Sequence, residues 1–236
     1  KVLKRDMTAL FGVRHVLELE HVFLYLCLHG GGLVDMQALC RDLELKKPTV
    51  NNFINLLEST HLIYKLPPFG YGKEILRARY KIYLADAAIA PSVLLKGISL
   101  LEDPAALGLA VETAFFKHVF ARYYSQSVGF SYWRGKGDRE VDIVAEVEGR
   151  LIPFEVKYRS QNTGAGDLKG LAEFCQTRKA SRGYVITREM QDFSIMPLGF
   201  EVETKNGSTP ARVAKIPAPL ACYWLGKNEL DTLAGE

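Results

Sequence analysis

The sequence of 236 residues lacks the long apolar runs and the strong charge excess that mark several classes of protein. Its longest apolar run, Val22 to Leu28, has seven residues, far fewer than the roughly 18 that a membrane span needs. The opening Lys-Val-Leu-Lys-Arg-Asp has no apolar segment typical of a secretory signal. With 48% hydrophobic and 24% charged residues, a globular chain is expected, and global disorder or a fibrous class is excluded. We therefore expect no membrane partner.

Cysteine is scarce, and no two cysteines are spaced as a CxxC pair. Each of the four has apolar neighbours, which favours reduced thiols in the core, with disulfides or a zinc site as the alternatives. The five histidines show no metal-binding spacing either. Together these features predict a cytoplasmic protein. The cysteines are Cys27, Cys40, Cys175 and Cys222.

The formal net charge of +3 is unevenly distributed. Residues 1–95 carry 12 basic and 9 acidic groups, whereas residues 96–236 carry 18 of each. Within the first segment, five basic residues face Glu74 alone, and such a strip can lie against nucleic acid. A solvated loop and strand is the alternative interpretation. The strip comprises Lys65, Lys73, Arg77, Arg79 and Lys81.

The first 95 residues show the order of a winged-helix domain. Helical periodicity over 10–28, 36–43 and 48–59 is followed by strand-like runs at 62–66 and 79–84. Asp35 is expected to cap the second helix, and Pro48 suits the first turn of the third. In a winged helix the third helix can enter the major groove of DNA. Such modules also serve as spacers or protein-docking units, and this alternative stays open.

The polar face of the third helix supplies the predicted contacts to DNA. Lysines before the helix can meet phosphates, and asparagine side chains can read adenine edges. The predicted nucleic-acid-binding residues are Lys46, Lys47, Thr49, Asn51, Asn52 and Asn55.

Residues 96–236 predict an α/β unit that begins with a helix over 105–123. Strands are expected at 130–134, 139–147 and 151–159, then a helix at 167–180 and a strand at 183–187. A two-residue turn at Glu148-Gly149 would pair Val147 with Arg150. That register sets Asp142 opposite Glu155 and Glu140 opposite Lys157.

This register would place two like charges side by side, which destabilises a sheet unless a cation lies between them. Carboxylate oxygens are the ligands that Mg²⁺ prefers, and Mn²⁺ would serve similarly. Glu112 lies on the apolar stripe of the helix at 105–123, where a carboxylate needs a partner. A metal held by Glu112, Asp142 and Glu155 beside Lys157 is suited to metal-assisted hydrolysis of a phosphodiester.

The sequence Asp142, twelve residues, then Glu155-Val156-Lys157, with Glu112 upstream, resembles the PD-(D/E)-x-K nuclease superfamily. The resemblance implies a restriction-endonuclease-like αβββαβ fold and a catalytic trio of Asp142, Glu155 and Lys157. In that family the Asp and the Glu bind Mg²⁺, and the Lys aids the attacking water. The upstream Glu112 is similar to that of Holliday-junction resolvases. Val141 stands where the family often has Pro.

A second resemblance covers nearly the whole chain. It rests on Lys47-Pro48-Thr49-Val50, Leu56-Leu57-Glu58 and Lys81-Ile82-Tyr83-Leu84-Ala85-Asp86, and then on Tyr132-Trp133-Arg134, Glu140-Val141-Asp142-Ile143-Val144 and Ile152-Pro153-Phe154-Glu155-Val156-Lys157. These strings resemble an uncharacterised domain found C-terminal to many prokaryotic AAA+ ATPases. The resemblance implies an ATPase domain upstream, to which ATP would bind, because this chain has no GxxxxGK[ST] motif. The absence of an initiator Met fits that expectation.

Two main functions remain open from the sequence. One is a DNA-associated C-terminal module of an ATPase that binds DNA or a partner protein, which the neutral charge of residues 96–236 favours. The other is an active Mg²⁺-dependent deoxyribonuclease, which the complete set of acidic residues and Lys157 favours. A transcription regulator built on the winged helix alone is a third interpretation.

Overall fold

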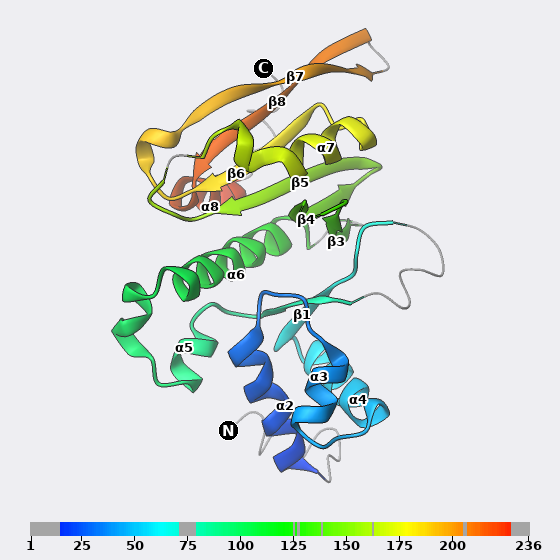
Figure 1. Cartoon of the computed structure of the whole chain (residues 1–236), viewed down its shortest axis with the longest axis vertical. Coiled ribbons are helices and arrows are strands. Elements are labelled where there is room, and N and C mark those ends of the chain that lie inside the picture. Colours follow the sequence, from blue (N-terminus) through cyan, green and yellow to red (C-terminus); the bar gives the residue numbers. More distant parts are fainter. Residues whose placement is uncertain are drawn as a thin grey trace.

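The computed structural model describes residues 15–70, 79–124, 126, 128–137, 139–161, 163–204 and 207–227. It has two parts, a helical part over residues 16–102 and a sheet part over residues 104–227 (Figure 1). The helical part contains α2 (Val16–His29), α3 (Met36–Asp42) and α4 (Lys47–Ser59), then the antiparallel strands β1 (Ile63–Leu66) and β2 (Lys81–Leu84). A short helix α5 (Ile89–Val93) and the 3-10 helix η3 (Gly97–Glu102) lead to the sheet part.

The second and third helices of the first part begin and end within one residue of the prediction. The first, predicted over 10–28, is α2 and begins at Val16, and residues 10–14 of that prediction lie outside the described residues. The Asp35 carboxylate accepts hydrogen bonds from the amides of Gln37 (2.9 Å) and Ala38 (3.1 Å), which confirms it as the cap of α3. Pro48 lies in the first turn of α4, where its missing N–H costs no hydrogen bond. The predicted apolar face of α4 is buried, and it consists of Val50, Phe53, Ile54 and Leu57.

The sheet part confirms an α/β fold and the predicted order of helix, three strands, helix and strand. It runs α6 (Pro104–Tyr123), β3 (Val128–Arg134), β4 (Glu140–Val147), β5 (Arg150–Lys157), η4 (Ala165–Leu168), α7 (Lys169–Arg178) and β6 (Arg182–Thr187). After η5 (Met190–Asp192), the chain adds β7 (Ser194–Thr204), β8 (Gly207–Pro217) and α8 (Ala218–Lys227). The six strands lie in the order β3-β4-β5-β6-β8-β7, with β6 parallel to both β5 and β8.

The hairpin between β4 and β5 has the predicted two-residue turn. Glu148 and Gly149 both have positive φ, at 51° and 76°, as a type I′ turn requires. The predicted register holds from Val147 opposite Arg150 to Ile143 opposite Phe154. The turn therefore fixes which β4 and β5 side chains share a face.

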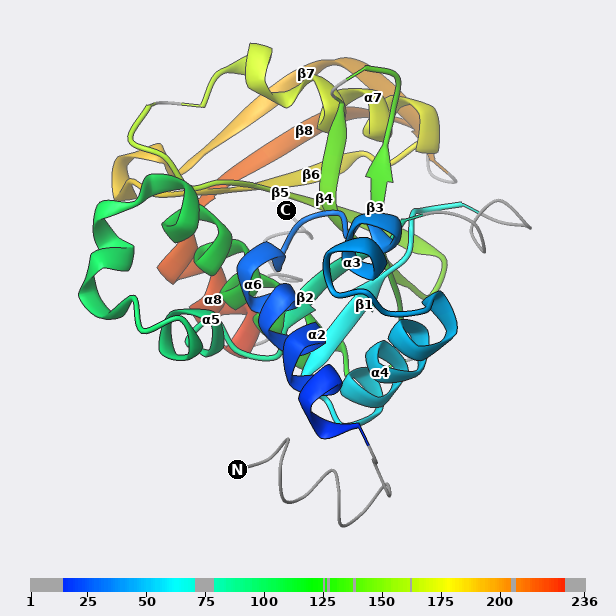
Figure 2. The ribbon, with the colours of Figure 1, turned by 60° about the horizontal axis from the view of Figure 1, so that its bottom comes forward.

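Helices cover both faces of the sheet, so the sheet part has three layers (Figures 1 and 2). Helices α6 and α8 pack on one face around Phe116, Phe154 and Ile216, and α7 packs on the other through Leu171 and Phe174. All four cysteines are free thiols. None of the helices in the described ranges combines the length and apolarity needed to cross a bilayer.

Strand β2 joins the two parts. The Tyr83 ring stacks on Phe116 of α6, with ring centroids 4.7 Å apart. Gly31, at a φ of +76°, lies so close to α6 that an added Cβ would stand 2.1 Å from Leu109 Cδ1. The amide of Phe69 donates to the Tyr132 carbonyl of β3 at 2.6 Å. These contacts bring the β2 side chains to the edge of the sheet part.

Candidate functional site

The four acidic and basic residues predicted for the nuclease site lie in one cleft. Glu112 comes from the middle of α6, Asp142 from the start of β4, and Glu155 and Lys157 from the end of β5. The cleft has a volume of about 830 Å³, and its lining also includes Lys81 and Glu140. The structure thus brings together Glu112, Asp142, Glu155 and Lys157 as the sequence predicted.

Asp142 is held between β5 and β2. The paired residues of β4 and β5 end with Ile143 opposite Phe154. The next pair in that register would be Asp142 opposite Glu155, and it is not formed. Asp142 Oδ2 instead accepts a hydrogen bond from the Val156 amide at 2.9 Å, and Oδ1 accepts one from Lys81 Nζ at 2.8 Å. Both carboxylate oxygens of Asp142 are therefore engaged by groups of the protein.

Lys81 lies at the centre of the carboxylates, and the prediction that it belongs to a DNA-facing basic strip is wrong. Its side chain is 5% exposed, and Nζ lies 2.7 Å from Glu140, 2.8 Å from Asp142 and 3.3 Å from Glu112. Tyr83, two residues along the same strand, donates to Glu112 Oε1 at 2.5 Å. Because side chains alternate along a strand, Lys81 and Tyr83 lie on the same face of β2, and both contact the carboxylate cluster of Glu112, Glu140 and Asp142.

Glu155 and Lys157 form a second pair beside this centre. Lys157 Nζ donates to Glu155 Oε1 at 2.5 Å, and Glu155 is 5% exposed. Glu155 Oε2 is buried and accepts no hydrogen bond from the described chain. The predicted pair of Glu140 with Lys157 is wrong, because Glu140 contacts Lys81 instead. The β4–β5 pairing ends at Ile143 and Phe154, so Glu140 and Lys157 are not paired, and the Glu140 side chain contacts β2.

Burial and the neighbouring charges raise the pKa values of two carboxyls, Glu112 and Glu155, and of two ammonium groups, Lys81 and Lys157. Burial, with repulsion from Asp142, raises the pKa of Glu112 to about 7 and that of Glu155 to about 8. Burial alone would lower the pKa of Lys81, but the carboxylates of Asp142, Glu112 and Glu140 reverse this and raise it well above its usual range. Near neutral pH, two ammonium groups therefore face a set of carboxyls of which two are partly protonated.

The carboxyls in this arrangement do not fit a divalent cation. The Lys81 ammonium already lies among the oxygens that Mg²⁺ would need, and Glu155 Oε1 is bound by Lys157. In the described ranges, no three His, Cys, Asp or Glu side chains are grouped so that they could hold a metal ion. The predicted metal ligands Glu112, Asp142 and Glu155 are thus adjacent, but the cation between Glu112 and Asp142 is a lysine.

The predicted DNA-contacting residues lie along the outer side of α4. Lys46, Lys47, Asn51, Asn52 and Asn55 are exposed, and Thr49 is half-buried. Several of them border a polar groove of about 570 Å³ between α3, α4 and the two strands, whose lining includes Lys47, Asn51, Asn55, Lys65 and Arg79.

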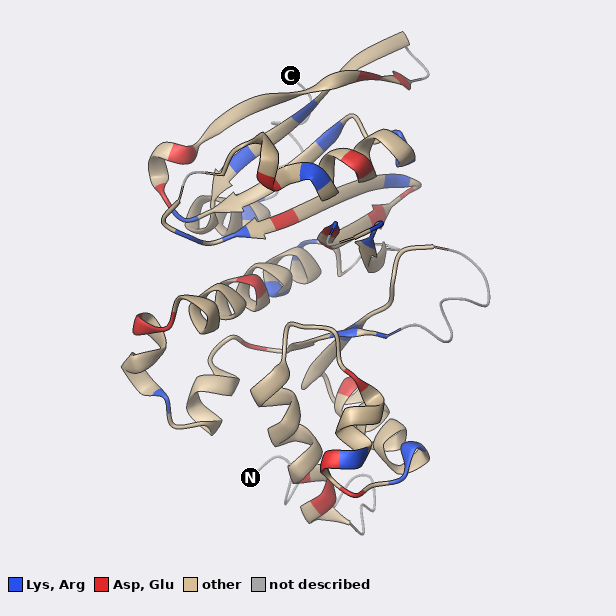
Figure 3. Ribbon diagram, in the orientation of Figure 1, with Lys and Arg blue, Asp and Glu red and all other residues tan. Residues whose placement is uncertain are grey.

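The rest of the predicted basic strip divides between this groove and residues outside the described ranges. Lys65 Nζ contacts Glu58 (2.6 Å) and Asn55 (2.9 Å), and Arg79 contacts Asp35 at 3.0 Å. Lys73, Glu74 and Arg77 lie outside the described residues. Basic and acidic residues are interspersed over both parts of the molecule (Figure 3).

Sequence reasoning missed the roles of Lys81 and Tyr83. The signal that could have revealed them is their alternation on a strand that is otherwise apolar, Lys81-Ile82-Tyr83-Leu84, all four residues of which are buried. A buried lysine needs a carboxylate partner. The partners lie 31 and 61 positions further along the chain, and no local pattern identifies them.

Two family models match successive segments of the chain. Residues 1–99 match a domain of unknown function, DUF8612, and residues 107–202 match another, DUF4143. The second is commonly associated with the C-terminal regions of AAA+ ATPases.

Similar proteins include uncharacterised proteins of Mycobacterium tuberculosis and Mycobacterium bovis, each 28% identical over 164 residues. That match covers 67% of this chain and 36% of each relative. An uncharacterised protein of Methanocaldococcus jannaschii is 24% identical over 157 residues, which cover 66% of this chain and 31% of that protein. The chain thus spans about a third of the length of the curated relatives it matches.

Proposed function

We propose that this chain is a DNA-associated module of a larger AAA+ type ATPase, and that its nuclease-like domain binds rather than cuts. The observation that carries the proposal is the position of Lys81. Its ammonium lies within 3.3 Å of three carboxylates, so the cluster has its own cation. A set of carboxylates balanced in this way stabilises the joint between the two parts and needs no metal.

The outer face of α4 supports the DNA association. Lys46 and Lys47 are exposed ahead of the helix, and three asparagines follow on its exposed side. The arrangement of three helices and a two-stranded sheet is compatible with a winged helix, in which such a face meets the major groove. Phosphate contacts from lysine would position the module, and the asparagine side chains would meet base edges.

The ATPase context is supported by the family models and by the size of the relatives. A DUF4143 segment and relatives nearly three times the matched length fit a module that belongs to a longer protein. This chain contains no phosphate-binding loop, so ATP would bind outside it.

A second candidate function is a nuclease that acts only when β2 withdraws Lys81 from the cluster. The observation that favours it is Glu155 Oε2, a buried carboxyl oxygen without a hydrogen-bond partner in the described chain. An oxygen of this kind is costly to leave unpaired, and functional sites keep such groups more often than purely structural ones.

The two candidates are separated by incubating the chain with supercoiled, branched and single-stranded DNA in the presence of Mg²⁺ or Mn²⁺. The binding module predicts no cleavage by the wild type, and affinity for DNA that falls steeply as salt rises. Lys46→Gln/Lys47→Gln should then weaken binding and reduce the salt slope by about one for each phosphate that is no longer neutralised. Lys96→Gln, an exposed lysine outside α4, is the matched control and should change neither quantity.

Cleavage by the wild type that disappears in Lys157→Ala would refute the binding-only proposal and support the nuclease. Lys81→Met tests whether the lysine blocks activity, because cleavage that appears only in this variant would support the withdrawal of β2. If neither DNA binding nor cleavage occurs at low salt, the proposed association with DNA is wrong.

A further inference from the structure

A second cavity lies in the sheet part, at the opposite end of β5 from the carboxylate cluster. It has a volume of about 520 Å³, and β5, β6 and the end of α7 supply most of its lining. Arg150 is the first residue of β5 and Lys157 the last, so these two side chains stand roughly 23 Å apart along the strand, and the two sites have no lining residue in common. The cavity therefore belongs neither to the carboxylate cluster nor to the α4 face.

All charged side chains that line this cavity are basic. Four basic residues line it, namely Arg150, Arg178, Lys179 and Arg182, and none of the lining residues is acidic. The acidic residues Glu112, Glu140, Asp142 and Glu155 gather at the other end of the sheet. The cleft that they line also contains Lys81 and Lys157, so acidic and basic side chains are mixed there, whereas the lining of the present cavity is basic alone.

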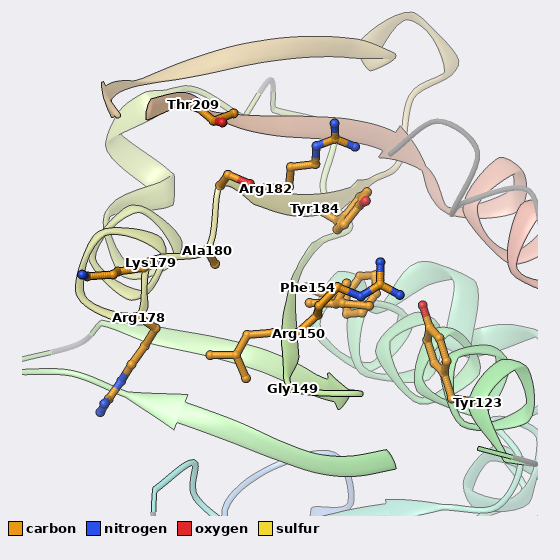
Figure 4. A pocket seen from close by; sticks show the side chains of 13 residues that line it. Tyr123, Gly149, Arg150, Phe154, Arg178, Lys179, Ala180, Arg182, Tyr184 and Thr209 are labelled. Atoms are coloured by element: carbon orange, nitrogen blue, oxygen red, sulfur yellow. The ribbon is translucent and has the colours of Figure 1, made fainter. Parts of the chain in front are cut away.

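Two of the arginines form the centre of the site. In Figure 4 the guanidinium groups of Arg150 and Arg182 lie on either side of Tyr184, whereas Arg178 and Lys179 point away from it. Arg178 is occupied elsewhere, with its guanidinium 5.2 Å from the Phe69 ring centroid. Arg150 and Arg182 form no ion pair with a carboxylate of the described chain. Within the described ranges, no carboxylate competes with a ligand for their charges.

A third arginine extends the same face. Arg182 of β6 is the register partner of Arg212 in β8, and Arg212 is exposed. Like charges on neighbouring strands destabilise a sheet, and an anion bound between them reverses that effect. The stacked rings of Tyr184 and Phe154, with centroids 5.3 Å apart, supply apolar surface to the same cavity. An apolar lining with a few polar groups is typical of a ligand site.

We propose that Arg150 and Arg182 bind a phosphate group, with Arg212 at the rim, and that its source is the backbone of a nucleic-acid strand. The forked guanidinium group matches phosphate oxygens in a bidentate geometry. The assignment of a strand as the source rests on the proposed function. The site would be a second contact to nucleic acid, on a different part of the molecule from α4.

The test compares the full chain with Arg150→Gln/Arg182→Gln and measures two ligands. Binding of a fluorescent single strand of about 20 nucleotides is followed by anisotropy over a range of salt. Binding of inorganic pyrophosphate is followed by calorimetry. Removal of two charge-assisted hydrogen-bonding groups should weaken binding on the order of tenfold each, and should reduce the salt slope for the strand by about 0.7 per phosphate.

Arg188→Gln is the matched control, since Arg188 is an exposed arginine just beyond the other end of β6 and should leave both affinities unchanged. Arg150→Lys/Arg182→Lys keeps the charge but loses the fork, and should bind with intermediate affinity. Equal thermal midpoints for all variants without ligand show that each one folds.

The two binding measurements distinguish a phosphate of a nucleic-acid backbone from a free phosphate as the ligand. Weaker strand binding in the glutamine variant supports a nucleic-acid backbone as the ligand. Weaker pyrophosphate binding with unchanged strand binding keeps the phosphate site but overturns the strand as its source. If neither ligand is affected while Lys46→Gln/Lys47→Gln weakens strand binding, the phosphate site is refuted and the proposed function stands.

Discussion

The buried lysine of β2 gives the sharpest prediction about this protein. Lys81→Met keeps the length of the side chain and removes its charge. Glu112, Asp142 and Glu140, with side chains 15%, 13% and 28% exposed, then lose the cation that they share. Removing one partner of a buried ion pair costs about 3–5 kcal/mol, because the remaining charge is left uncompensated. We expect a loss of that order in the free energy of unfolding at about pH 8.

The loss should shrink at lower pH. The pKa of Glu112 is already raised to about 7 by burial, and without Lys81 it rises further. A carboxyl whose pKa is raised in the folded state binds more protons folded than unfolded, so stability falls as pH rises through that window. Below about pH 6, protonation relieves the uncompensated charge, and Lys81→Met should approach the wild type.

The assay is chemical denaturation at about pH 5.5 and pH 8. Lys65→Met is the matched control, because Lys65 lies on the neighbouring strand and pairs with Glu58 at a partly exposed position. Its loss should cost about 1 kcal/mol or less, with little dependence on pH. A Lys81→Met variant that loses less than about 1 kcal/mol at pH 8, or the same amount at both pH values, would refute the charge balance that we describe.

Three further predictions concern the same joint and the sheet behind it. In Tyr83→Phe the hydrogen bond to Glu112 is lost, and the free energy of unfolding should fall by about 1.5–3 kcal/mol in urea denaturation. In Gly170→Ala the new Cβ would stand 2.4 Å from the Glu140 carbonyl oxygen, so thermal unfolding should show a loss of about 1–3 kcal/mol. In the wild type, the raised pKa values of Glu112 and Glu155, about 7 and 8, predict that stability falls between about pH 5 and pH 8, measured as the thermal midpoint against pH.

Each of these three has a control. Tyr80→Phe removes a hydroxyl at a half-buried position and should be nearly neutral. Gly166→Ala places a Cβ where no atom lies within 4 Å, and should not destabilise the chain. Glu155→Gln should flatten the wild-type pH dependence, and an unchanged slope would contradict the assignment of that slope to the cluster.

The sequence by itself determined the main helices and strands up to β6 and much of the site, whereas it did not determine β7, β8 and α8. Helical periodicity located α4 and α6 to within a residue or two, since burial of one face repeats every 3.6 residues. The turn at Glu148-Gly149 determined the register of β4 and β5, because two residues with positive φ allow one tight hairpin geometry. That register, with the Glu-x-Lys spacing, was enough to place Asp142, Glu155 and Lys157 together.

Only the tertiary structure decided what lies between the carboxylates. The sequence required a cation beside Asp142 and predicted a metal, whereas the fold supplies Lys81 from a strand 61 positions earlier. The presence of Arg150 and Arg182 in one cavity is equally non-local, since β5 and β6 are parallel strands joined by α7. Side chains from distant segments meet through the packing of whole elements, and neither composition nor period encodes which of them will share a cavity.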